Sequence, residues 1–407
     1  MLNRILKNAA SRPERSLAFA IFTVTGIIYY VFVWHFAQNI PLWDDYDTAF
    51  GFMETYQNLD FPDNFLLLFS QHNEHRIFSY HVLVPLQHFF FGEVNFRYMI
   101  FAGNLVLPAL AFVMFRFHSA FRDNPLLFVP VFLLLFVPRG IMGMSGMLMY
   151  LFCLGSLWML TRNNIKAFVT ALVMAALTTA SFGNGFFIFP LGLGILLTEK
   201  ERNRHYILTW SLFAVLITLL FFTNYHSVAD LPAKSGAFSH PVQVMAFFIT
   251  FFSAPYVPLI APLEYLYIAT GCLVLSVFLY GIWINRKQIL QHRVIVSFLL
   301  FILLAAFSAS ISRYNFGTGG AIADRYIFIS VLFSAFVYIL IVNKIASFGK
   351  KTTILLLALS LILYLTRMEI NEEKLTMHTA DIKSSLVGFM IQPDSCKIGR
   401  ASCRERV

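Results

Sequence analysis

Apolar runs of about 17–25 residues, each long enough to cross the hydrocarbon core of a bilayer, recur along the whole chain. The chain has 407 residues, of which 58% are hydrophobic and only 13% are charged. Soluble globular domains carry about 25% charged residues. We therefore predict an all-α polytopic membrane protein.

The basic residues indicate how the chain crosses the membrane. The net charge is +9, but the lysines and arginines gather in short loops between apolar runs. This pattern follows the positive-inside rule and argues against nucleic acid as a partner. Four basic residues precede the first run, so we expect a cytoplasmic N-terminus. The first run, residues 16–37, is too long for a cleavable signal and is expected to be an uncleaved anchor.

Placing every basic loop on the cytoplasmic side gives about eleven spans. They are expected near residues 16–36, 96–115, 125–138, 147–161, 167–181, 186–198, 206–223, 262–284, 294–310, 326–343 and 353–366. Two further apolar runs, 77–91 and 243–258, are expected to be half-inserted. If both crossed, the total would be thirteen and the loops between them would change sides. The run 77–91 is short and contains His81, Pro85, Gln87 and His88, which favours a re-entrant or interfacial helix.

The pattern predicts a single membrane domain, residues 1–366, with a large external loop at 38–94 as its catalytic part. Residues 367–397 are expected to form an external tail that is truncated. Residues 398–407 read like a translated sequencing adapter, so we expect them to be an artefact outside the native protein. We find no fixed-period repeat and no second soluble domain.

The external loop opens with a dense group of carboxylates, Trp43-Asp44-Asp45-Tyr46-Asp47, directly after the first span. A solvated loop or a helix N-cap would explain them structurally. The functional interpretation is a general base or a metal-binding pair at the membrane surface. Two adjacent aspartates can divide the work, one as base and one orienting the acceptor or binding a cation. We predict Asp44 and Asp45 as catalytic, with Trp43 and Asp47 binding substrate.

The loop closes with His72-Asn73-Glu74-His75-Arg76, beside an apolar segment. An interfacial polar belt is the structural alternative. The two histidines and Glu74 could hold a metal, but the zinc pattern HExxH is absent. Substrate binding is favoured for all five residues. Arg76 would neutralise a phosphate, and His75 or Glu74 would contact sugar or phosphate oxygens.

A glycine-rich turn, residues 317–320, lies between Arg313 and Arg325 in a later external loop. Glycine-rich backbone can offer amides to an anion. Two external arginines suit a lipid phosphate, although snorkelling to head groups would also explain them. The turn lacks the Lys-Ser/Thr ending of a nucleotide P-loop. We predict Arg313, Arg325 and Tyr326 as substrate-binding.

These features together resemble the GT-C class of polytopic glycosyltransferases, which use polyprenyl-phosphate-linked sugars. The likeness rests on the basic-flanked first span, the loop opening with Trp43-Asp44-Asp45, the later external arginines, and the half-inserted helix closing with Phe91-Gly92 before Arg97. The His-Pro-Pro or Lys-Pro-Pro element of several GT-C families is absent where residues 73–76 stand. The resemblance covers most of residues 1–366 and is closer to uncharacterised bacterial members than to a named enzyme.

The resemblance implies transfer of a hexose or pentose from a polyprenyl-phosphate donor to a cell-envelope glycan or lipid acceptor, such as lipopolysaccharide. The reaction would occur at the periplasmic face of the bacterial inner membrane. Asp44 or Asp45 would deprotonate the acceptor hydroxyl. Arginine, or a divalent cation such as Mg²⁺ or Mn²⁺ with Asp45 and Glu74 as possible ligands, would stabilise the leaving phosphate. Membrane lipid is an expected partner.

Three other functions compete with glycosyl transfer. An O-antigen polymerase or ligase is expected to place its key arginines in a large later external loop, whereas here the large polar loop comes first. A lipid or solute transporter would need charged or broken helices at the bilayer midplane. The polar groups of this chain gather instead at one surface. A non-catalytic scaffold is the third alternative.

Overall fold

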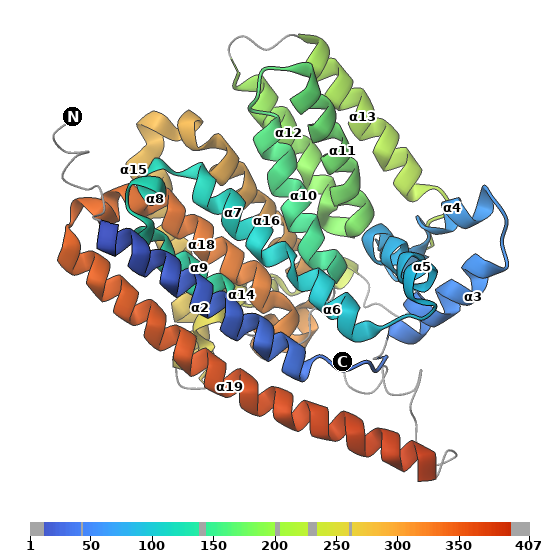
Figure 1. Ribbon diagram of the computed structural model, residues 1–407. Helices are drawn as coiled ribbons and strands as arrows, with labels where there is room; N and C mark the ends of the chain where they lie inside the picture. Colours follow the sequence, from blue (N-terminus) through green and yellow to red (C-terminus); the bar gives the residue numbers. More distant parts are fainter. Residues whose placement is uncertain are drawn as a thin grey trace.

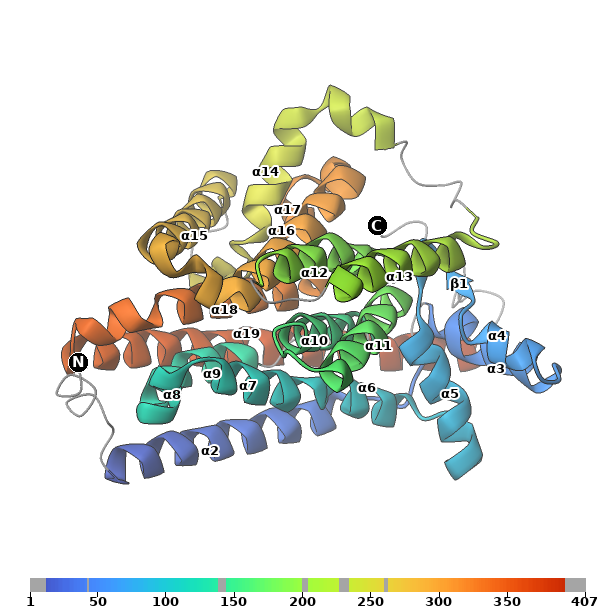
Figure 2. The same cartoon turned by 90° about the horizontal axis from the view of Figure 1, so that it is seen from above.

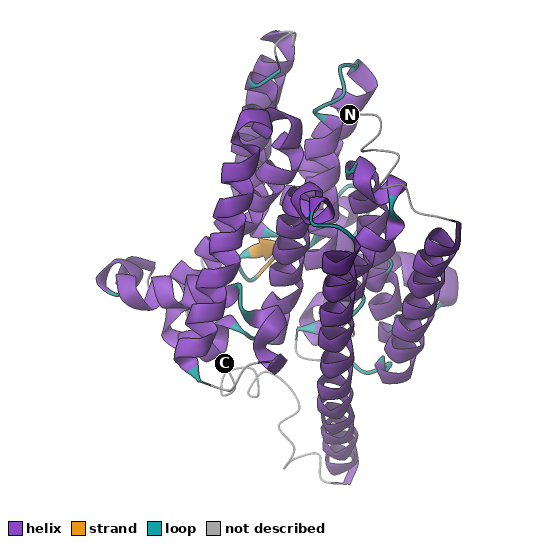
Figure 3. Cartoon of the chain, turned by 90° about the vertical axis from the view of Figure 1, so that its left-hand side faces the viewer, coloured by secondary structure: helices purple, strands orange, loops and turns teal. Residues whose placement is uncertain are grey.

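The structure is a computed structural model that describes residues 12–41, 44–137, 144–199, 204–226, 234–259 and 263–391. These residues form helices almost throughout, with one two-stranded hairpin (Figures 1 and 3). The α-helices are α2 (Arg12–Phe36), α3 (Phe52–Gln57), α4 (Asp63–Leu67), α5 (Phe78–Phe91), α6 (Phe96–Asn104), α7 (Val106–Phe117), α8 (Ser119–Asp123), α9 (Val129–Leu135), α10 (Met144–Met159), α11 (Ile165–Ser181), α12 (Ile188–Leu197), α13 (Arg204–Phe222), α14 (Pro241–Phe251), α15 (Glu264–Asn285), α16 (Arg293–Arg313), α17 (Gly317–Ala321), α18 (Asp324–Ser347) and α19 (Lys350–Ile391).

Short helical turns and one hairpin complete the described chain. The turns are η1 (Tyr46–Gly51), η2 (Pro125–Phe128), η3 (Gly183–Phe187), η4 (Lys234–Ser239), η5 (Ala254–Leu259), η6 (Arg286–His292) and η7 (Tyr314–Phe316). The strands are β1 (Gln71–His72) and β2 (His75–Arg76). An apolar chain favours helices because hydrocarbon offers no partner for a backbone N–H or C=O group.

The predicted all-α membrane class is confirmed by the length and composition of the helices. Among the described residues, six helical stretches are long and apolar enough to cross a membrane, and one of them, Glu264–Ala321, contains both α15 and α16. Five shorter apolar helices accompany them. Each of the eleven expected spans coincides with one of these helices. The number that cross the bilayer stays a prediction.

Helices α9, α15, α16 and α19 pack against α18, which is buried along most of its length. In Figure 2, α14 and α15 lie at the top and α2 at the bottom, with α18 between them. Phenylalanine side chains fill this core, and Phe298, Phe328, Phe333 and Phe336 are all fully or almost fully buried. By contrast, α2, α13 and α19 turn most of their apolar surface outward. Apolar helix faces exposed in this way suit contact with lipid.

The run expected to be half-inserted near residues 77–91 forms α5, which has 14 residues. A helix of that length extends about 21 Å, less than the roughly 30 Å of a hydrocarbon core. Figure 1 views α5 nearly end-on, whereas α2 runs across the picture; the turned view in Figure 2 shows α5 at full length. This helix therefore runs steeply across the direction of α2, as an interfacial helix would.

The second such run forms α14 and η5, which are separated by a break after Phe252. Arg367 of α19 lies buried beside this break and donates hydrogen bonds to the carbonyl oxygens of Ala254 and Pro255. Helix α19 continues without interruption across residue 366, where the sequence suggested the start of a tail. Residues 392–407, which include the suspected artefact, lie outside the described residues.

Close packing of α14 against α15 depends on a glycine. A Cβ atom on Gly271 would collide with the carbonyl oxygen of Ile249. We expect Gly271→Val to force the two helices apart and to lower the unfolding temperature in detergent, because overpacking costs about 1–3 kcal/mol or more. The matched control is Gly194→Val, since a Cβ at Gly194 would meet no atom within 4 Å. Equal unfolding temperatures for the two variants would contradict this packing.

Candidate functional site

The hairpin β1–β2 lies at the end of the polar loop that follows α2 and is the only sheet among the described residues. Gln71 pairs with Arg76, and His72 pairs with His75. The turn residue Asn73 has a φ of 49°, a left-handed conformation that asparagine tolerates better than most residues. Figure 3 shows these strands surrounded by helices. The hairpin thus brings the titratable residues of the loop close to the ends of the membrane helices.

Arg76 fastens the hairpin to the end of α13. Its Nε and Nη2 atoms lie 2.9 and 2.6 Å from the carbonyl oxygen of Phe221, and Nη2 lies 2.6 Å from that of Thr223. Nη1 donates to the carbonyl oxygen of Phe69. The guanidinium also lies over the Phe221 ring, 5.3 Å from its centroid. The last carbonyls of a helix have no partner within it, so Arg76 serves as a cap for α13.

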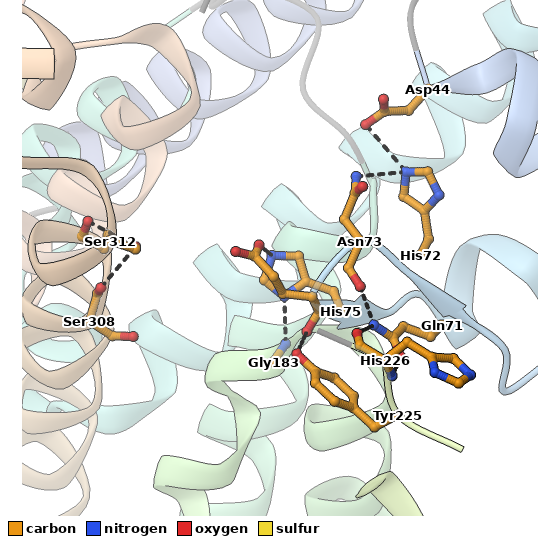
Figure 4. Close-up of polar contacts among 12 residues, drawn as sticks. Asp44, Gln71, His72, Asn73, His75, Gly183, Tyr225, His226, Ser308 and Ser312 are labelled. Atoms are coloured by element: carbon orange, nitrogen blue, oxygen red, sulfur yellow. Dashed lines mark hydrogen bonds and ion pairs between the residues drawn. The ribbon is translucent and has the colours of Figure 1, made fainter. Parts of the chain in front are cut away.

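Gln71 provides a second attachment at the other strand. Its Nε2 atom donates to the carbonyl oxygen of His226 at 2.6 Å, and its Oε1 atom accepts from the His226 N–H at 2.9 Å. The Tyr225 hydroxyl reaches the backbone oxygen of Glu74 at 3.5 Å (Figure 4). Both strands are therefore bound to the segment that follows α13.

His75 is held on the opposite side by the end of α11. Its ring stacks on Phe182 with a centroid separation of 3.6 Å. Its Nδ1 atom accepts a hydrogen bond from the Gly183 N–H at 3.3 Å, and its Nε2 atom lies 3.8 Å from Glu74 Oε2. Because Nδ1 is an acceptor, the proton of a neutral His75 ring belongs on Nε2. The ring therefore presents its N–H toward the Glu74 carboxylate.

Asp44 forms a second pair of carboxylate and imidazole. Its Oδ2 atom lies 3.5 Å from His72 Nε2, and the Asn73 side-chain amide lies 3.0 Å from the same nitrogen. The side chain of Asp44 is 65% exposed, while that of His72 is 23% exposed. The hydrogen bond from His72 lowers the pKa of Asp44 despite partial burial, which raises it.

Asp45 has a different partner. The hydroxyl of Tyr80 on α5 donates to Asp45 Oδ1 at 2.7 Å. Burial, together with the charge of Asp45, raises the pKa of the Tyr80 hydroxyl. This hydroxyl therefore keeps its proton at neutral pH and remains a donor. The two adjacent aspartates have separate supports, an imidazole for Asp44 and a phenol for Asp45.

The predicted residues near the glycine-rich turn form a second group. Arg313 is half-buried at the end of α16, and Arg325 is exposed at the start of α18. The Arg325 guanidinium lies 5.2 Å from the centroid of the Tyr326 ring, and that ring is buried against Phe247 and Phe251. Within the described part of the chain, no hydrogen bond or ion pair joins this group to the hairpin.

The end of α16 nevertheless faces the hairpin. In Figure 4, Ser308 and Ser312 lie on the side of the view opposite Asp44 and His72, with His75 between them. The turn η3, whose Gly183 binds His75, also packs against α16. Arg313 follows Ser312 directly in the chain. The structure thus places Arg313 at the same end of the bundle as the two carboxylate–imidazole pairs, but without direct contact.

The structure therefore brings together only some of the predicted residues. The hairpin joins Asp44 with His72 and Asn73, and Glu74 with His75. Arg76 is committed to carbonyl oxygens, which differs from the phosphate-binding role we expected. Asp47 is exposed on η1, and Trp43 lies outside the described residues.

The donor set for a resident metal ion is incomplete in the described residues. No group of three or more histidine, cysteine, aspartate or glutamate side chains there is close enough together to hold an ion. Asp45 and Glu74, the two expected candidates, have separate partners, Tyr80 and His75. These residues do not fit a protein-bound Mg²⁺ or Mn²⁺ site, and we assign no chemical step to one.

Sequence reasoning did not identify the side chains that hold the site in place. Tyr80, Gln71 and Tyr225 carry no motif, and Tyr225 lies about 150 residues from the other two. Gly183 had a weak signal, since it belongs to a short Gly-Asn-Gly turn between two apolar runs. A Cβ at this position would lie 2.9 Å from His75 Nδ1, so close approach of the ring requires glycine.

No protein-family model, no curated protein and no solved structure matches this chain. The function must therefore be argued from the residues and their geometry alone.

Removal of the His72 imidazole should change the titration of Asp44. The hydrogen bond stabilises the carboxylate form, so we expect His72→Ala to raise the pKa of Asp44 toward the ordinary aspartate value. The pair adds to the free energy of unfolding at pH values above the ordinary aspartate pKa. This contribution is lost as the pH falls through the lowered pKa of Asp44. Isotope-edited infrared titration measures this, with the Asp44 band identified by its loss in Asp44→Asn.

His226→Ala is the matched control, because the side chain of His226 is exposed and only its backbone binds Gln71. We expect an unchanged Asp44 titration in that variant. An Asp44 titration in His72→Ala that is identical to the wild type would exclude the proposed pairing.

Proposed function

We propose that this protein is a membrane glycosyltransferase of the GT-C type. It would move a sugar from a polyprenyl-phosphate donor to a cell-envelope glycan or lipid acceptor on the periplasmic side of the bacterial inner membrane. The observation that carries the proposal is the pair of adjacent carboxylates, Asp44 and Asp45, each held by a different side chain near the outer end of α2. An enzyme that activates a hydroxyl at a membrane surface needs such an arrangement.

In the proposed reaction, the acceptor hydroxyl attacks C1 of the donor sugar while an aspartate takes its proton. The bond between C1 and the phosphate oxygen breaks, and polyprenyl phosphate leaves with the bonding electron pair. Asp45 is the proposed base, because the Tyr80 hydroxyl fixes one of its oxygens. Asp44 orients the acceptor, supported by His72. General base assistance of this kind is typically worth about 10²- to 10⁴-fold in rate.

The negative charge of the leaving phosphate requires a cation. Because Arg76 is bound to carbonyl oxygens, we assign this role to Arg313, with Arg325 and Tyr326 near the same end. The hydroxyls of Ser308 and Ser312 on the same helix can add hydrogen bonds to phosphate oxygens. Glu74 and His75 are proposed to bind the hydroxyl groups of the sugar, since their carboxylate and imidazole lie next to each other beside η3.

We propose that the short helix α5 lies in the membrane interface, which would suit a donor that arrives through the membrane. Tyr80, which holds Asp45, lies on the first turns of this helix. The last residues of the same helix, Phe89, Phe90 and Phe91, are strongly exposed. Aromatic side chains at this depth suit the boundary between head groups and acyl chains. A lipid-linked sugar could therefore reach the carboxylates from the side of the bilayer.

A lipid or solute transporter is the second candidate. One observation favours it: the buried Arg367 lies beside the broken helix α14–η5, and transporters often place such features at a substrate site. However, the Arg367 guanidinium already binds the carbonyl oxygens of the first two residues of η5, Ala254 and Pro255. Transport would also leave the two supported aspartates without a role.

Asp45→Asn should abolish transfer while the protein still inserts and folds. We expect the rate to fall about 10²- to 10⁴-fold, with a smaller loss in Asp44→Asn because that residue orients the acceptor. The assay measures release of polyprenyl phosphate from radiolabelled polyprenyl-phosphate hexose and pentose donors by protein in nanodiscs, with membrane extracts as acceptor.

Asp60→Asn is the matched control, since Asp60 is exposed in the same loop and is given no role in the site. We expect wild-type rates in that variant. If the double variant Asp44→Asn/Asp45→Asn transfers sugar as fast as the wild type, the mechanism is wrong. If the wild-type protein transfers no sugar but solute flux across sealed vesicles depends on Arg367, the transporter hypothesis replaces the glycosyltransferase hypothesis.

A further inference from the structure

The end of α15 opposite the hairpin carries an exposed apolar face that leads directly into two cations. Leu279, Tyr280 and Trp283 are 63%, 44% and 58% exposed. The Tyr280 and Trp283 rings stack at a centroid distance of 6.1 Å. Residues three or four positions apart are neighbours on one face of a helix. One such row contains positions 279, 283 and 286, and another contains positions 280, 283 and 287. The apolar surface therefore ends at Arg286 and Lys287.

A cavity opens at this point. It is a shallow hollow that is open at the surface, with a volume of about 320 Å³, and its lining residues are Ile284, Arg286, Lys287 and Gln288, of which the last three are exposed. It forms where the chain turns out of α15 into η6, since Gln288 leaves the helical conformation with φ −125° and ψ 19°.

The two lining cations have no acidic partner among the described residues, where no ion pair includes either of them. The Arg286 guanidinium lies 4.8 Å from the centroid of the Trp283 ring and donates to the Trp283 carbonyl oxygen at 3.0 Å. By contrast, Arg293 at the far end of η6 pairs with Glu199. The positive charge at the cavity is therefore not neutralised by this part of the protein.

We propose that this cavity binds the head group of an anionic phospholipid from the cytoplasmic leaflet. The phosphate would contact Arg286 and Lys287, and the Gln288 amide would donate to a head-group oxygen. The acyl chains would lie along Leu279 and Trp283. A lipid fits better than a free anion because the cations continue an exposed apolar face, so one ligand satisfies both surfaces. This site is independent of the proposed glycosyl transfer.

The test uses delipidated full-length protein in detergent, titrated with phosphatidylglycerol or phosphatidylcholine. Native mass spectrometry gives the affinity for the first lipid bound, and thermal unfolding gives the accompanying stabilisation. In Arg286→Gln/Lys287→Gln we expect phosphatidylglycerol to bind about 30-fold more weakly, because each cation near a membrane surface contributes about a factor of five. Phosphatidylcholine should bind weakly to both proteins.

The matched control is Lys350→Gln/Lys351→Gln, which removes two exposed cations at the start of α19 without any contact with the cavity. Wild-type affinity is expected in this control. An equal loss in both double variants would mean that general surface charge attracts the lipid, and would overturn the proposal. The same stabilisation by inorganic phosphate as by phosphatidylglycerol would indicate a free-anion site and would also overturn it.

A third variant covers the case in which the double substitution fails to fold. Gln288→Glu adds a carboxylate to the cavity lining and leaves both cations in place. Weaker binding of phosphatidylglycerol with unchanged binding of phosphatidylcholine supports the site. Unchanged binding of both lipids contradicts it.

Discussion

Every backbone N–H and C=O group that enters hydrocarbon must find its partner within the protein, and this requirement shapes the whole structure. Helices meet it along their length but fail at ends and breaks. In two places near helix ends, an arginine from a distant segment binds backbone carbonyl oxygens. Arg367 binds those of the first two residues of η5, and Arg76 binds those at the end of α13. Both arginines connect segments more than 100 residues apart, so the capping of one helix also fixes the position of another element.

The candidate site follows from the second of these contacts. With Arg76 fastened to α13 and Gln71 to His226, the hairpin has a fixed place at one end of the bundle. Its two histidines then reach in different directions, His72 to Asp44 and His75 to Glu74 and Gly183. The arginine that the sequence suggested for a phosphate thus acts in positioning, and the proposed phosphate contact moves to Arg313.

The two ends of the bundle differ in chemistry. The end with the hairpin presents carboxylates supported by imidazole and phenol groups, which suits proton transfer. The opposite end presents Arg286 and Lys287 around a cavity beside an exposed aromatic face. Basic residues on one side are what the positive-inside rule requires. In the proposed arrangement they also bind lipid, so the same charges would orient the protein and anchor it to the cytoplasmic leaflet.

The sequence alone determined the helical class, the position of the eleven apolar helices and the existence of the short apolar helix α5, because each depends on local length, hydropathy and charge. It also identified the residues of the polar loop, since dense titratable groups beside membrane helices are conspicuous. Only the tertiary structure decided their partners. Which donor supports Asp44 or Asp45, and whether Arg76 faces a ligand or a helix end, depends on contacts across 28 to 147 residues of chain. Such contacts leave no periodic signal, because they are set by how the helices pack and where their unpaired carbonyls lie.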